Sequence, residues 1–338
     1  MPPPIRHMFV IVLENKPFEE TFGPNSPAPY LAHELAGKGV LLTNYYGIGH
    51  SSLDNYLALI SGQAPNPDTQ ADCGTLLDFE LSQPNLDANG QAIGGGCVYP
   101  TIVKTLPDQL EAVGFTWRGY MEDLGKDPKR DAQASCHIVV GALDHTNQAT
   151  PGDQYADKHN PFIYFHSIID NPARCDQHVV NLDALPKDLE KVETTPNFAF
   201  ITPNSCHDGH DAPCKNGEQG GLVSADQFLR TWVPRIVASP AFQQDGLLVV
   251  TFDEGTDSTA CCDERGLPGG PQPGKNGPGG GRIGAVLVSP FVTPGTISKV
   301  DYNHYSLLRS IEDFFRLPHL GYAGMPGLAP FGTDVFSR

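Results

Sequence analysis

The sequence predicts an α/β protein, a three-layer sandwich in which helices cover both faces of a mostly parallel central sheet. The first observation is a set of short apolar runs with the composition of strands, at residues 8–13, 197–201, 246–252 and 283–288. The second is a set of segments with helical spacing, at residues 28–39, 52–62, 102–114, 224–239 and 304–317. Strands that alternate with helices are typical of a parallel sheet covered on both faces.

The elements are supported by their local patterns. The run "FVIVL" at residues 9–13 has no polar alternation and is rich in β-branched residues, as in a strand buried on both faces. The segments "APYLAHELAGKG" and "SLDNYLALISG" combine helical apolar spacing with a glycine at the end, which for the second segment is Gly62. These patterns predict two helices between the first strand and the later ones.

Composition limits the class of protein. The chain has 338 residues, of which 39% are hydrophobic, and no apolar run approaches the roughly 20 residues of a membrane span. The formal net charge of −17 argues against a nucleic-acid partner, although one cation in a pocket can still attract a small anionic substrate. We expect one domain over residues 1–338, with loop insertions that are functional or disordered at 63–100, 121–160 and 255–281.

The chain contains eight cysteines and no C-x-x-C pair. An even number in loop-like segments indicates disulfides and an oxidising compartment. We therefore predict at least three disulfides in a secreted or periplasmic protein whose export signal has been removed, because "MPPPIRH" has no apolar signal core. The alternative is a cytosolic protein with free thiols. Chain order suggests these pairs: Cys73 with Cys97, Cys136 with Cys175, and Cys206 with Cys214, Cys261 or Cys262.

Polar residues follow three of the predicted strands. They are Glu14 and Asn15, then Asn204, His207, Asp208 and His210, and finally Asp253 and Glu254. The carboxyl ends of parallel strands lie along one edge of a sheet, where carboxylates buried together need a compensating cation. Each strand end alone could be structural. Three in succession favour a metal site with the oxygen ligands that Mg²⁺, Ca²⁺ or Mn²⁺ prefers.

The segment "GIGHSSLDNYLALISG" places His50, Ser51 and Ser52 directly before an apolar helix. A serine at this position is by default an N-cap. The same position also suits a phosphate, because the helix N-terminus offers N–H groups and the positive end of the dipole. A serine oxygen that also binds a metal would be a nucleophile at neutral pH.

Seven segments in order resemble the bacterial phosphoesterase family, which includes acid phosphatases and phospholipases C within the alkaline phosphatase superfamily. They are "LENKPFEETFG", "HSSLDNYLALISG", "KHNPFIYF", "TPNSCHDGHD", "VVTFDEG", "GGGRIGAVLVSPFV" and "YNHYSLLRSIEDFF". The resemblance runs from residue 9 to about residue 320 and implies an alkaline-phosphatase-like fold.

The resemblance also implies roles for residues. One divalent metal would be held by Glu14, Asn15, Ser52, Asp253 and Glu254, with Ser52 as the nucleophile. The family also shows two aspartates at the second acidic pair, so Glu254 lengthens one ligand and leaves the identity of the metal open. Mg²⁺, Ca²⁺ or Mn²⁺ is favoured, and the habit of the superfamily keeps zinc possible. The residues expected around the phosphate are Asn55, His50, His159, His210 and His304.

A second metal would need Asn204, Asp208, His210 and His304. Because Asn204 is a neutral ligand, we favour one metal, with His159 and His210 offsetting the remaining charge.

The resulting hypothesis is a metal-dependent phosphomonoesterase of the acid phosphatase type, with a phosphoserine intermediate at Ser52 and a leaving group protonated by His210 or His159. The alternatives are a phospholipase C-type phosphodiesterase and a secreted phosphate-binding protein without turnover. The chain ends soon after its last family segment, without the extra domains of the larger phospholipases, which favours the monoesterase. The expected partner is a small phosphate ester, with a lipid surface only for a phospholipase. The sequence does not indicate an oligomeric state.

Overall fold

The computed structural model describes residues 3–130 and 138–337. The strands of its large sheet are β1 (His7–Leu13), β2 (Val40–Leu42), β6 (Trp117–Met121), β7 (Val179–Asn181), β8 (Phe198–Thr202), β9 (Gly246–Phe252), β10 (Ala285–Val288) and β11 (Thr296–Ser298). Two short pairs lie outside this sheet: β3 (Tyr45–Tyr46) with β12 (Tyr302–Asn303), and β4 (Glu80–Leu81) with β5 (Gly94–Gly95).

In the described part of the chain, eight strands form the large sheet in the order β11-β2-β10-β9-β1-β8-β6-β7. From β9 through β1, β8 and β6 to β7, each strand pairs with its neighbour in parallel. β10 runs antiparallel to β9 and to β2, whereas β11 is parallel to β2. The sheet is therefore mostly parallel, which confirms the predicted fold class.

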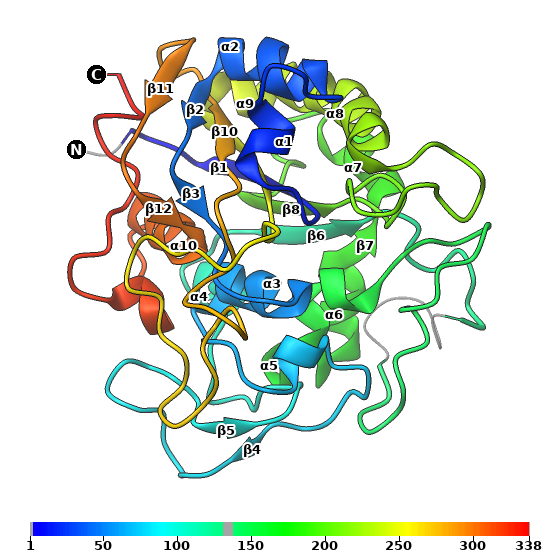
Figure 1. The fold of residues 1–338 in the computed structure, drawn as a ribbon, viewed down its shortest axis with the longest axis vertical. Helices are drawn as coiled ribbons and strands as arrows, with labels where there is room; N and C mark the ends of the chain where they lie inside the picture. The colour runs from blue at the N-terminus through cyan, green and yellow to red at the C-terminus, as the bar shows by residue number, and fades with distance from the viewer. Residues whose placement is uncertain (1–2, 131–137, 338) are drawn as a thin grey trace.

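Helices cover both faces of this sheet. The α-helices are α1 (Phe18–Phe22), α2 (Ala36–Lys38), α3 (Ser52–Ser61), α4 (Leu106–Ala112), α5 (His166–Ile169), α6 (Pro172–His178), α7 (Leu185–Asp188), α8 (Gly221–Val237), α9 (Pro240–Asp245) and α10 (His304–Phe315). Figure 1 shows α2, α8 and α9 on one side of the sheet and α3, α4 and α10 on the other. The arrangement is the predicted three-layer sandwich.

Single helical turns complete the list. They are the π-helix η1 (Tyr30–Leu35) and the 3₁₀ turns η2 (Thr69–Ala71), η3 (Asp157–His159), η4 (Pro161–Tyr164), η5 (Leu182–Ala184) and η6 (Gly321–Gly324). Of the described helices, none has the length and apolar character required to cross a bilayer.

The register of the central strands positions the site. All seven residues of β1 are buried, as expected for a strand covered on both faces. β1 pairs with β9 so that Leu13 lies opposite Phe252. The next residues, Glu14 and Asp253, therefore leave the sheet at the same level on adjacent strands. Polar strand ends thus meet along one edge of the sheet, as predicted.

Helix α3 brings the serine segment to this edge. All ten of its residues are buried, as expected for a helix enclosed by other elements. It ends at Gly62, which has a φ of 68° and whose N–H bonds the Ala58 carbonyl over 3.0 Å. Glycine adopts this left-handed conformation without steric cost, so the predicted glycine stop is confirmed.

The four strands and most of the helices predicted from sequence are present. Two details differ from the prediction. Residues 28–39 form η1 followed by α2, and β10 is antiparallel to its neighbours. Four strands of the large sheet were not predicted: β2, β6, β7 and β11. The segment of β6, "WRGYM", contains a charged residue and a glycine. Gly119 is required there because a Cβ atom would lie 2.4 Å from the Phe162 ring. Packing, which is not visible in the local pattern, determines this strand.

Three disulfides lie within the described residues, so the predicted minimum is confirmed. They join Cys73 to Cys97, Cys206 to Cys214, and Cys261 to its neighbour Cys262. The first pair is the predicted one, and the second is one of the three partners considered for Cys206. The predicted pairing of Cys136 with Cys175 involves residue 136, which lies outside the described residues.

Candidate active site

Glu14 is the centre of a buried hydrogen-bond cluster beyond β1. Its side chain is 1% exposed and accepts three hydrogen bonds from other side chains. Ser52 Oγ and Asn15 Nδ2 donate to Oε2 over 2.8 and 2.9 Å, and Tyr56 OH donates to Oε1 over 2.5 Å. The Ser52 hydroxyl is therefore held by a carboxylate from the neighbouring strand end.

The helix-capping explanation for Ser52 does not hold. Ser51 is the N-cap residue of α3 and makes no side-chain cap bond, whereas Ser52 is the first helical residue. The Ser52 side chain is directed to Glu14 instead. The structure thus places the predicted nucleophile at the positive end of a buried helix and against a predicted metal ligand.

Asp253 joins the same cluster from β9. Its Oδ1 accepts the Asn15 backbone N–H over 2.8 Å. Asn15 has a φ of 52°, a left-handed conformation that asparagine tolerates better than most residues. The other oxygen of Asp253, Oδ2, is buried without a hydrogen-bond partner among the described residues. Burial raises the pKa of Asp253, as expected for a carboxylate that lacks a compensating charge.

Glu254 is satisfied by a histidine rather than by the cluster around Glu14. Its carboxylate forms an ion pair with Nδ1 of His50, and His50 Nε2 lies 2.9 Å from the Asp257 carbonyl. Burial raises the pKa of Glu254 to about 7. Burial alone would lower the pKa of His50, but Glu254 raises it.

His159 lies on the other side of Glu14 and is buried. Its ring stacks on Tyr56, with centroids 5.4 Å apart, and Nε2 lies 3.3 Å from Glu14 Oε1. Nδ1 lies 3.7 Å from Oδ2 of Asp208, and neither ring nitrogen has a hydrogen-bond partner among the described residues. Burial lowers the pKa of His159 well below its ordinary value.

Two predicted phosphate-facing residues have structural partners instead. Asn55 Oδ1 accepts the backbone N–H groups of Ile48 and Gly49, and its Nδ2 donates to the carbonyls of Gly49 and Ser51. Asn55 therefore holds the loop that precedes Ser52, and its contact with phosphate stays a prediction.

His304 is similar. Its Nε2 lies 2.6 Å from the Asp253 carbonyl, and its Nδ1 lies 3.1 Å from the Tyr45 hydroxyl. Burial lowers its pKa to about 4. His304 thus supports the backbone of a predicted metal ligand, and its contact with phosphate also stays a prediction.

The side chains of the four candidates for a second metal have different partners. Asn204 donates to Asp123 Oδ2 over 2.7 Å, and His210 is 55% exposed in an ion pair with Asp211. Asp208 alone of the four joins the Glu14 cluster, where one ligand atom each from Glu14, His159 and Asp208 lie within 4.8 Å of one another. Burial raises the pKa of Asp208 to about 7.

The electrostatics of the cluster favour a bound cation. Burial raises the pKa of Glu14 well above its ordinary value, and the charges of Asp253 and Asp208 raise it further. Several buried carboxylates in one place are costly unless a positive charge compensates them. The orphaned oxygens of Asp253 and Asp208 provide donor atoms for such an ion. The residues present therefore fit a divalent cation with oxygen ligands.

Two residues of the cluster were missed by sequence reasoning. Tyr56 lies one helical turn after Ser52 and donates to Glu14. Lys158 precedes His159 and is the basic residue whose charge lowers the pKa of Glu14. The spacing of Tyr56 from Ser52 could have indicated that both lie on one helix face. Lys158 gave no comparable signal.

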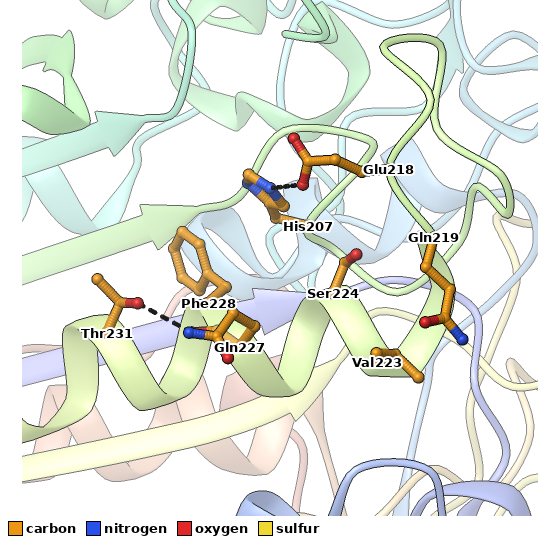
Figure 2. Close-up of a pocket in the computed structure, with 8 residues that line it drawn as sticks. All are labelled: His207, Glu218, Gln219, Val223, Ser224, Gln227, Phe228 and Thr231. Atoms are coloured by element: carbon orange, nitrogen blue, oxygen red, sulfur yellow. Dashed lines mark hydrogen bonds and ion pairs between the residues drawn. The ribbon is translucent and has the colours of Figure 1, made fainter.

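A separate cavity of about 330 Å³ lies along α8. Figure 2 shows its lining, in which His207 and Glu218 face each other above Ser224 and Phe228. His207 also pairs with Glu122 over 2.8 Å, and these two carboxylates raise its pKa to about 9 despite burial, which lowers it. None of the predicted catalytic or metal-binding residues lines this cavity.

The chain has the fold of the alkaline phosphatase superfamily. A structure from Vibrio parahaemolyticus described as a member of that superfamily aligns with a TM-score of 0.55 at 13% identity, over 98% of this chain and 72% of that chain. Residues 25–318 match the Phosphoesterase family, and the chain belongs to this family.

Named relatives are similar over most of the chain. A probable acid phosphatase of Kluyveromyces lactis is 28% identical over 94% of this chain and 59% of its own length. An acid phosphatase of Aspergillus fumigatus is 28% identical over 93% of this chain and 55% of its own. A phosphatidylinositol-3-phosphatase of Mycobacterium tuberculosis is 25% identical over 99% of this chain and 84% of its own length. The chain therefore spans little more than half of the fungal relatives.

Proposed function

We propose that this chain is a metal-dependent phosphomonoesterase that works through a phosphoserine intermediate at Ser52. The observation that carries the proposal is the 2.8 Å hydrogen bond from Ser52 Oγ to the buried Glu14 carboxylate at the start of α3. A hydroxyl held by a carboxylate at a helix N-terminus can pass its proton to that carboxylate as its oxygen attacks phosphorus and the P–O bond to the leaving alcohol breaks, while the helix dipole favours the anionic substrate.

The metal would be held by Glu14, Asn15, Ser52 and Asp253, and Glu254 would join them only if its ion pair with His50 opened. When bound, a divalent cation would lower the pKa of the serine hydroxyl and offset the charge of the phosphoryl oxygens. The unpartnered oxygen of Asp253 and the raised pKa of Glu14 support such a ligand set. Oxygen donors favour Mg²⁺, Ca²⁺ or Mn²⁺, and zinc is a further option.

The two candidate acids differ in charge. Burial lowers the pKa of His159, which disfavours the protonated ring that a proton donor needs. The pair with Asp211 raises the pKa of His210, and its side chain is 55% exposed. We therefore assign protonation of the leaving group to His210. We assign to His159, whose Nε2 lies 3.3 Å from Glu14 Oε1, the role of accepting a proton from the water that hydrolyses the phosphoserine.

The names of the relatives support monoesters as substrates. All three are named as phosphatases, and the name of the mycobacterial relative gives a phosphorylated lipid as its substrate. The disulfides support an oxidising compartment outside the cytoplasm. A phospholipase C-type diesterase remains the alternative that the test below separates.

The test compares p-nitrophenyl phosphate with bis(p-nitrophenyl) phosphate in the metal-loaded and chelated protein. We expect turnover of the monoester in the presence of metal, loss after chelation, and loss in Ser52→Ala with the fold intact. Preference for the bis-ester would replace the monoesterase with a diesterase. Absence of turnover for both, with metal bound, would leave a phosphate-binding protein.

A further inference from the structure

Lys158 is linked through Asp72 to the helix that carries Ser52, although the sequence did not single it out. It belongs to η3, next to His159, and its Nζ is 3.3 Å from Oδ2 of Asp72. The other oxygen of Asp72 accepts the N–H of Leu53 over 3.1 Å. Because Leu53 follows Ser52, one aspartate ties the ammonium of Lys158 to the first turn of the helix that carries Ser52.

The ammonium faces the acidic cluster rather than bulk solvent alone. The Lys158 side chain is 24% exposed, whereas Glu14 is almost fully buried. Burial would lower the pKa of Lys158, but the charges of Asp72, Glu14 and Asp253 raise it. A lysine ammonium is positively charged at neutral pH, and the charge of Lys158 acts on Glu14 and Asp253 as well as on Asp72.

The hydrogen-bonding capacity of this ammonium is not used up. An ammonium carries three donors, and Asp72 is its one hydrogen-bond acceptor among the described residues. The remaining donors are available to an anion that reaches Ser52. Asp72 fixes the side chain, so less rotational freedom is lost when the anion binds.

Phosphate monoesters and diesters differ in charge, and a lysine can distinguish them on that basis. A phosphate monoester carries a charge of about −1.5 to −2 near neutral pH, whereas a diester carries one negative charge. A second positive charge beside the proposed metal therefore attracts a monoester more strongly than a diester. We propose that Lys158 is a specificity-determining residue that selects dianionic phosphate monoesters at Ser52, an inference that rests on the proposed function.

The competing explanation is that Lys158 only neutralises Asp72. The two explanations differ in selectivity, because a purely structural role would affect monoesters and diesters alike. Lys126 is a matched control, since it also forms an ion pair with an aspartate, Asp123, over 2.5 Å, but away from α3. Lys275 is a second comparison, because its Nζ donates to the Ser51 hydroxyl over 2.9 Å.

The experiment measures kcat/KM for p-nitrophenyl phosphate and its bis-ester, together with inhibition by inorganic phosphate, in the metal-loaded protein. In Lys158→Met we expect monoester kcat/KM to fall about 10- to 100-fold and the phosphate inhibition constant to rise in parallel. Bis-ester kcat/KM should stay within about threefold. Lys158→Arg should keep most of the preference, and Lys126→Met should match the wild type.

Equal losses for both esters in Lys158→Met would overturn the inference, as would a selectivity change confined to Lys275→Met. The double variant Asp72→Asn with Lys158→Met removes the whole pair, so it provides the same comparison if the single variant leaves Asp72 unpaired and does not fold. Absence of wild-type turnover with both esters would refute the proposed function instead, so the two failures are distinguishable.

Discussion

Tyr56 provides a sharp test of the cluster, because one hydroxyl can be removed while the ring stays. Its OH donates to Glu14 Oε1 over 2.5 Å, and its ring stacks on His159. A hydrogen bond to a charged group contributes about 1.5–3 kcal/mol, equivalent to about a 10- to 150-fold change in an equilibrium. Tyr56→Phe should therefore lower metal affinity and monoester kcat/KM by about 10- to 100-fold, as is typical when a ligand loses its outer partner.

The assay combines isothermal titration with Mg²⁺ or Mn²⁺ and steady-state kinetics at saturating metal. Tyr164→Phe is the matched control, since Tyr164 is fully buried and its hydroxyl has no hydrogen-bond partner among the described residues. That variant should bind metal and turn over substrate like the wild type. If Tyr56→Phe behaves like Tyr164→Phe, Glu14 is not positioned by this hydroxyl and the assigned ligand geometry is wrong.

Three further predictions follow from individual contacts. Asp253→Asn keeps an acceptor for the Asn15 N–H but removes the charge, so metal affinity measured by titration should fall at least about tenfold while the fold persists. Asn55→Ala removes four hydrogen bonds to the loop before Ser52 and should lower the free energy of unfolding in urea by about 2–5 kcal/mol; an unchanged value would contradict the loop-holding role. Burial raises the pKa of Glu312 to about 9, so the native state holds a proton that the unfolded state releases. The free energy of unfolding should therefore fall as pH rises towards 9, by up to about 1.4 kcal/mol per pH unit. Urea unfolding at several pH values should show a flatter profile for Glu312→Gln, and identical profiles would contradict a protonated Glu312.

The edge of the sheet could be predicted from sequence because it depends on local patterns. An apolar run followed at once by Glu14 or Asp253 indicates a buried strand that ends in polar residues, and parallel pairing brings such ends together. The glycine that ends α3 could likewise be read from the helical pattern. These features need no knowledge of which distant segments pack together.

The remaining features depend on tertiary packing. Lys158 reaches the site through a loop whose path the sequence does not determine, and its partner Asp72 comes from another insertion. The partners of Asn55 and His304 could not be predicted, because the backbone groups around both and the Tyr45 hydroxyl beside His304 are brought near them only by the fold. The antiparallel direction of β10 is also set by the path of the chain between strands rather than by its own residues.

The phosphoserine at Ser52 is the central claim, and trapping it tests the account most directly. The metal-loaded protein is mixed with a substrate that carries a radiolabelled phosphoryl group, quenched in acid during turnover, and digested for peptide mapping. The account predicts stoichiometric label on the peptide that contains Ser52, and no label in Ser52→Ala. Undiminished turnover with label on a histidine such as His159, or with no protein-bound label under any quench condition, would contradict it.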